Sequence, residues 1–103
     1  MFNINGIDWG IKLVSPNHPK IKRHDGSIAL GSCDDTTKTI YVSEAIPTYK
    51  LKKVLCHEIT HAAMFSYGVE MNIDQEELVA DLIATYGAEI INVTNKIFSR
   101  IAK

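Results

Sequence analysis

Two histidines and a glutamate lie close together in the middle of the chain, within the stretch VLCHEITHAAM at residues 54–64. His57 and His61 are four residues apart, so a helix would place both imidazoles on one face, where they can bind one metal ion. Glu58 is rotated by about 100° from His57, which keeps its carboxylate beside the ion without making it a ligand. Such a carboxylate can accept a proton from a zinc-bound water, whose pKa the metal lowers to about 7. The stretch therefore predicts two metal ligands and a general base.

A catalytic zinc ion usually has a third protein ligand and one open position for water. No histidine follows His61, so we expect the third ligand to be a carboxylate. The segment that starts DQEELVAD offers four candidates: Asp74, Glu76, Glu77 and Asp81. Glu77 is favoured because it shares a helix face with Asp81, and Glu76 is the alternative.

The same helix face suggests how the third ligand could reach the metal. Ala84 and Ala88 continue this face, with Ala80 beside it, and small residues would let the two helices approach closely. Asp81 could then accept a hydrogen bond from the nitrogen of His57 that points away from the metal.

Glu77 has a competing role at the start of its helix. With Asp74 it has the spacing of a capping box, in which the glutamate folds back on the helix start. Asn72 and Gln75 offer the same pair further upstream, which would leave Glu77 free to bind metal.

The combined pattern HExxH followed by ExxAD resembles the ImmA/IrrE type of metallopeptidase, within the wider glutamate-zincin group. The residues that carry the resemblance are His57, Glu58, His61, Glu77, Ala80 and Asp81. It covers residues from about 33 to 88, and it implies a zinc peptidase with the two histidines and Glu77 as ligands and Glu58 as general base. Several members of that family are encoded on phages or other mobile elements and act on a repressor protein inside the cell.

Two function hypotheses follow. The leading one is a zinc peptidase that holds an extended peptide beside an edge strand and cleaves it with water activated by Glu58. The alternative is a zincin-shaped regulatory or interaction protein that binds metal without turnover. It is motivated by the lack of an assigned oxyanion donor, because Tyr67 and Tyr86 are interpreted as packing residues.

The elements that must position these residues change along the chain from strands to helices. An apolar, partly alternating run predicts a strand at Ile7–Val14, and two further runs around the polar DDTTK loop predict a hairpin at Ser27–Ser43. A helix is expected from about Pro47 to a stop at Gly68.

A second helix is expected from about Ile73 to the C-terminus. Asn72 or Asp74 would cap its start, and Gly87 could bend or break it. The prediction is an α+β fold with one domain over residues 1–103, in which a small, mainly antiparallel sheet packs with two long helices.

Composition limits the partners and the setting. Of 103 residues, 46% are hydrophobic and 22% are charged, which is ordinary for a globular protein, and no apolar run reaches the length of a membrane span. A net charge of −1 gives no argument for a nucleic-acid partner. The first residues do not resemble a secretion signal, so we expect a cytoplasmic protein with Cys33 and Cys56 as reduced thiols.

Overall fold

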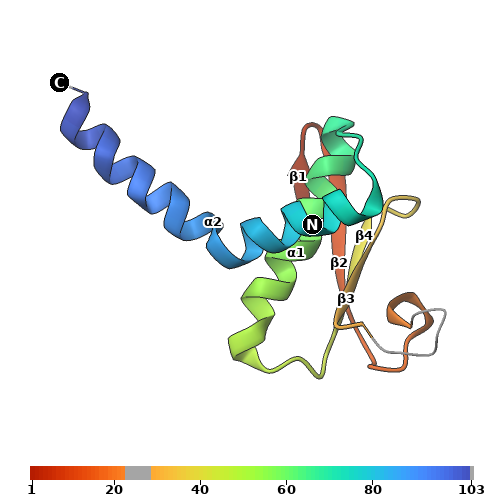
Figure 1. The fold of residues 1–103 in the computed structure, drawn as a ribbon. Coiled ribbons are helices and arrows are strands. Elements are labelled where there is room, and N and C mark those ends of the chain that lie inside the picture. The colour runs from red at the N-terminus through yellow and green to blue at the C-terminus, as the bar shows by residue number, and fades with distance from the viewer. Residues whose placement is uncertain (23–28, 103) are drawn as a thin grey trace.

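The computed structural model describes residues 1–22 and 29–102, and it has the predicted α+β fold (Figure 1). Its strands are β1 (Phe2–Ile4), β2 (Ile7–Val14), β3 (Gly31–Asp34) and β4 (Thr39–Ser43). A short 3-10 helix, η1 (Pro19–Ile21), follows β2, and two long helices, α1 (Thr48–Tyr67) and α2 (Ile73–Ile101), end the chain.

The four strands form one mixed sheet in the order β1-β2-β4-β3. The β1–β2 and β3–β4 pairings are antiparallel, whereas β2 and β4 pair in parallel at the centre, with Gly10 opposite Thr39. All five residues of β4 are buried, as is typical of a strand covered on both faces. The sheet thus contains the predicted β3–β4 hairpin, whereas the sequence pattern predicted neither the β1–β2 hairpin nor the parallel pairing of β2 with β4.

The β3–β4 hairpin lies within the predicted range Ser27–Ser43. Its strands are shorter than expected, because β3 begins only at Gly31, and residues 27 and 28 fall outside the described part. Strand β1 is an addition to the predicted elements. It turns into β2 through Asn5 and Gly6, which both have positive φ (49° and 79°), the geometry that an Asn-Gly hairpin turn adopts.

A core of Trp9, Ile40, Val42 and Ala62 joins the sheet to α1. The indole Nε1 of Trp9 donates a hydrogen bond of 2.8 Å to Ser66 Oγ near the end of α1. Burial of these side chains, together with the satisfied indole, fixes the face that α1 turns toward the sheet and leaves the histidine face toward α2.

Both helices begin and end close to the predicted residues. Pro47 precedes the first residue of α1, and Gly68 ends the helix in the left-handed conformation (φ 65°) with its N–H donated to Met64 and Phe65 carbonyls. Asn72 caps α2 in a capping box with Gln75, so this upstream pair, and not Asp74 with Glu77, holds the helix start. Helix α2 continues through Gly87 without a break. No helix within residues 1–22 and 29–102 combines the length and apolarity needed to cross a membrane.

Candidate metal centre

The predicted ligands meet where the first turns of α2 cross the middle of α1. Ala80 is fully buried at this crossing, and Ala84 is half-buried, so small side chains do allow the close approach. Ala88 is exposed and takes no part in the contact, because α2 has by then left α1. The approach brings Glu77 from α2 to the two histidines of α1.

Three donor atoms converge at this point. His57 Nε2 lies 3.2 Å from His61 Nε2 and 3.1 Å from Glu77 Oε2, and His61 Nε2 lies 3.0 Å from Glu77 Oε1. Zinc bonds to nitrogen and oxygen of about 2.0–2.2 Å would put tetrahedral ligand atoms about 3.3–3.6 Å apart, slightly farther than these separations. The group of His57, His61 and Glu77 could therefore hold a metal ion.

The other ring nitrogen of each histidine faces a carboxylate of α2. His57 Nδ1 lies 3.0 Å from Asp81 Oδ1, the contact predicted for Asp81. His61 Nδ1 lies 2.6 Å from Glu76 Oε1. Glu76, the alternative third ligand, therefore lies behind His61 and outside the group of donor atoms.

These two carboxylates determine what the histidines offer at the centre. An imidazole that donates its Nδ1–H to a carboxylate carries a lone pair on Nε2, and ligand histidines in metal sites are commonly oriented in this way. With both histidines in this tautomer, two lone pairs and the Glu77 carboxylate point at one another. These electron-rich groups would repel one another, and a cation between them would attract all three. The donor set therefore fits a metal ion.

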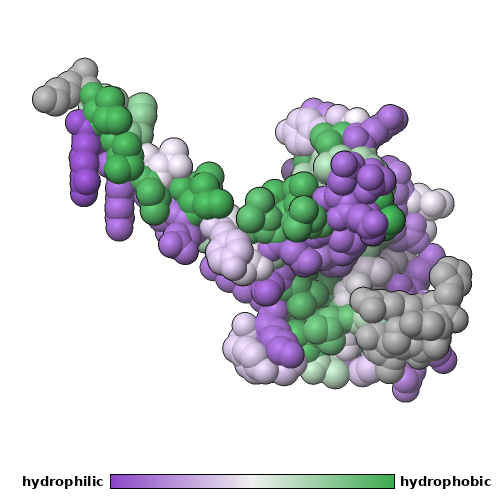
Figure 2. Space-filling model, in the orientation of Figure 1, coloured by the Kyte–Doolittle hydropathy of each residue, from purple (hydrophilic) through white to green (hydrophobic). Residues whose placement is uncertain are grey.

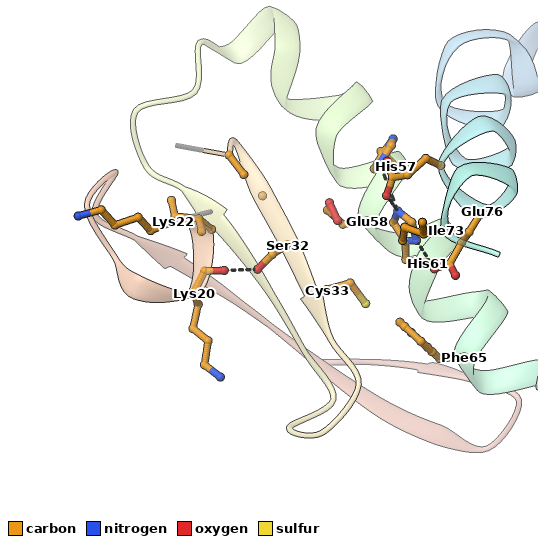
Figure 3. Close-up of a pocket in the computed structure, with 14 residues that line it drawn as sticks. Lys20, Lys22, Ser32, Cys33, His57, Glu58, His61, Phe65, Ile73 and Glu76 are labelled. Atoms are coloured by element: carbon orange, nitrogen blue, oxygen red, sulfur yellow. Dashed lines mark hydrogen bonds and ion pairs between the residues drawn. The ribbon is translucent and has the colours of Figure 1, made fainter. Parts of the chain in front are cut away.

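Glu58 lies next to this group on α1 but turns toward the sheet (Figure 3). Its side chain is buried, and this burial raises the carboxyl pKa. The charge of Glu77 acts in the same direction, whereas His57 and His61 lower the pKa. A buried carboxyl with a raised pKa beside a metal centre is suited to accept and return a proton.

Gly31 makes room for Glu58 and was not predicted to matter. A Cβ at position 31 would lie 3.2 Å from three neighbouring atoms: Glu58 Cγ, Tyr41 O and Val54 Cγ1. The absence of a side chain thus lets β3 pass directly over the glutamate. Only the approach of β3 to α1 reveals this role, which the sequence alone does not show.

Two cavities adjoin Glu58, one on each side along α1. The first, of about 340 Å³, extends toward Cys33 and Phe65, and the second, of about 360 Å³, extends toward Lys50 and Lys53. Both are lined by the four residues Ala29, Gly31, His57 and Glu58. The two cavities therefore form a trough between β3 and α1, with the histidine group and Glu58 near its middle.

The remaining candidates lie apart from the centre. Tyr67 and Tyr86 are exposed and line neither cavity, so neither is buried in the core of the described residues. Cys33 and Cys56 are free cysteines, and burial raises the pKa of the Cys33 thiol to about 12. Cys33 borders the trough as a neutral thiol.

Comparison of the chain with protein-family models, with curated proteins and with solved structures gives no match.

Proposed function

We propose that this protein is a zinc-dependent peptidase. The observation that carries the proposal is the convergence of three donor atoms, with a carboxylate behind each histidine and a buried glutamate beside them in a trough. His57 Nε2, His61 Nε2 and a Glu77 oxygen would hold the ion. When bound, zinc would supply Lewis-acid chemistry: it polarises a carbonyl and lowers the pKa of water.

Glu58 would perform the proton transfers. It accepts a proton from the attacking water as the water oxygen bonds to the carbonyl carbon of the peptide. It then returns this proton to the amide nitrogen as the C–N bond breaks, which gives a carboxylic acid and an amine. Asp81 and Glu76 would hold the two imidazoles in the ligand tautomer throughout.

An extended peptide suits the shape of the site. Strand β3 is at the edge of the sheet, hydrogen-bonded to β4 among the described strands, and it forms one wall of the trough. A peptide laid along β3 could add to the sheet while its scissile bond lies over Glu58. Both halves would meet lysines, Lys50 and Lys53 on one side and Lys20 and Lys22 on the other, and Phe65 borders only the second side.

The resemblance to ImmA/IrrE-type enzymes favours a protein substrate, such as a repressor of a phage or mobile element in the cytoplasm. A second candidate is a metal-binding regulatory protein without turnover. It is favoured by one feature, that no tyrosine is among the described residues lining the trough, which leaves the oxyanion donor unassigned.

Peptide cleavage tests the proposal and separates the two candidates. The zinc-loaded full chain is incubated with a library of unstructured peptides, and new termini are detected by mass spectrometry. We expect cleavage by the wild type and a loss of about a hundredfold or more in Glu58→Gln, which keeps zinc because Glu58 is not a ligand. The exposed Glu70 provides the matched control, Glu70→Gln, which should retain full activity. If neither the wild type nor Glu58→Gln cleaves any peptide, although both bind zinc, the regulatory protein is favoured.

A further inference from the structure

The second half of α2 carries a large apolar surface that the rest of the described chain does not cover. Every residue from Ala88 to Ala102 is exposed. Figure 1 shows this part of the helix projecting away from the sheet and α1, and Figure 2 shows hydrophobic side chains along it. The exposed apolar residues of this part are Ile90, Ile91, Val93, Ile97, Phe98 and Ile101.

A helix in this position lacks stabilising contacts. Isolated helices of about 12–15 residues are marginal in water, and most helices in proteins depend on the packing of an apolar face. Polar residues such as Asn92 and Ser99 occupy part of the other side of this helix, which also carries the exposed Ile91 and Phe98. Such a helix needs a partner surface.

The spacing of the apolar residues indicates what kind of surface that is. Ile83, Tyr86, Ile90, Val93 and Ile97 follow each other at alternating intervals of three and four residues. Each is between 40% and 54% exposed. Over two heptads, up to Arg100, this is the a and d spacing of a coiled coil, which matches another helix of the same kind. We call these five residues the α2 stripe.

Charges beside the stripe indicate the direction of pairing. Glu89 and Lys96 lie on the same flank, one heptad apart. In an antiparallel pair of identical helices, this flank of one copy runs beside the same flank of the other in reverse order. Glu89 of one copy would then face Lys96 of the second copy, and symmetry repeats the pair. In a parallel pair, Glu89 would face the uncharged Thr94.

We propose that two copies of this chain associate through their α2 stripes as an antiparallel coiled coil. The stripe is self-complementary, as an interface with twofold symmetry requires. From Ile83 to Ile97 it extends for about 21 Å, and Ile101 lengthens the apolar edge by a further turn. The metal centre lies on the preceding turns of α2, so each copy keeps its own site, and the proposal does not depend on the proposed function.

Sedimentation velocity of the full chain over a concentration series tests the association. We expect a reversible monomer–dimer equilibrium for the wild type. Ile90→Glu places a charge in the stripe and should weaken dimerisation by at least about tenfold. Asn92→Glu, on the opposite face, is the control and should leave dimerisation unchanged. Fluorescence of the single, buried Trp9 monitors whether each variant remains folded.

Charge exchange tests the antiparallel arrangement. Glu89→Lys and Lys96→Glu should each weaken self-association, because each creates a flank of one sign. A mixture of the two variants should dimerise more strongly than either alone, since both pairs become complementary. The proposal is overturned if the wild type remains monomeric at all concentrations or if Ile90→Glu dimerises like the wild type. It is also overturned if the mixture of the two charge variants dimerises no more strongly than either variant alone. The first result would mean that a different molecule covers the stripe.

Discussion

Three acidic residues at the start of α2 contact different atoms of the two histidines. Glu77 lies at the Nε2 atoms, whereas Glu76 and Asp81 each lie at an Nδ1 atom. Their contacts with the Nδ1 atoms leave the Nε2 atoms of both histidines facing Glu77 in the candidate metal centre. The side chain of Glu76 is only 16% exposed, against 65% for Asp81. Because a better-buried charge orients its partner through a stronger interaction, we expect His61 to depend on Glu76 more than His57 depends on Asp81.

Removal of the Glu76 charge should weaken metal binding. Glu76→Gln keeps a hydrogen-bond acceptor but lowers the basicity of His61, and we expect zinc affinity to fall by about 10- to 100-fold. Competition with a chromophoric chelator measures this change. Asp74→Asn, which removes an exposed charge from the same helix turn, should bind zinc like the wild type. Equal affinity in Glu76→Gln and Asp74→Asn would show that Glu76 does not position His61.

Cys33 offers a test of burial beside the trough. Its thiol has a raised pKa of about 12, so folding favours the neutral form. This contribution to stability is complete below the ordinary thiol pKa and is lost as the pH rises from about 9 toward 12. In urea denaturation, the free energy of unfolding should therefore fall more steeply above about pH 9 in the wild type than in Cys33→Ala. Identical pH profiles would show that Cys33 ionises as readily in the folded protein as in the unfolded chain.

At the scale of elements, the site depends on the distance between β3 and α1. A methyl group at Gly31 must displace β3, Glu58 or Val54, since three atoms lie 3.2 Å from its position. We expect Gly31→Ala to lower the free energy of unfolding by about 1–3 kcal/mol. Gly10, in β2, provides the control, because a methyl group there would meet no atom within 4 Å.

Urea denaturation of the two glycine variants gives the comparison. Gly10→Ala should be neutral or slightly stabilising, because alanine reduces the entropy of the unfolded chain. If both variants unfold at the same urea concentration as the wild type, the contact between β3 and Glu58 is looser than described.

Local signals predicted most of these elements. Helix α1 has apolar periodicity and a glycine stop, and the start of α2 has its capping pair, so both were predictable from neighbouring residues. The parallel β2–β4 pairing was not, because it joins strands separated by η1 and β3 and leaves no local pattern. Strand β1 was missed although Asn5-Gly6 is a strong turn signal.

Prediction of the site was limited in the same way, because spacing along one helix says nothing of the contacts between elements. The identities of His57, Glu58 and His61 follow from spacing on one helix. The choice of Glu77 over Glu76 depends on the rotation of α2 against α1, which only the packed helices determine. The trough and the role of Gly31 depend on β3, far away in sequence.

At the scale of the whole molecule, α2 makes the chain elongated. The radius of gyration is 15.5 Å, against about 13 Å for a compact protein of this size, and the longest dimension is 54 Å. A helix of 29 residues is about 43 Å long, so α2 alone accounts for most of this dimension. The part near α1 carries the carboxylates of the candidate metal centre, and the projecting part carries the stripe.

This division predicts that metal binding and self-association are separable. Ile90→Glu should bind zinc with the affinity of the wild type, because the stripe lies beyond the turns that hold Glu76, Glu77 and Asp81. Chelator competition on this variant measures the affinity, and a clear loss of zinc binding in the folded variant would show that the two parts of α2 are coupled.

The central claim is that His57, His61 and Glu77 hold one zinc ion. The most direct test is a calorimetric titration of the metal-free protein with zinc. Trp9 fluorescence shows whether each variant is folded. The account predicts one tight equivalent in the wild type and in Glu58→Gln, and its loss in His61→Ala and in Glu77→Gln. Absence of tight binding in the folded wild type, or one tight equivalent retained by folded His61→Ala, would contradict it.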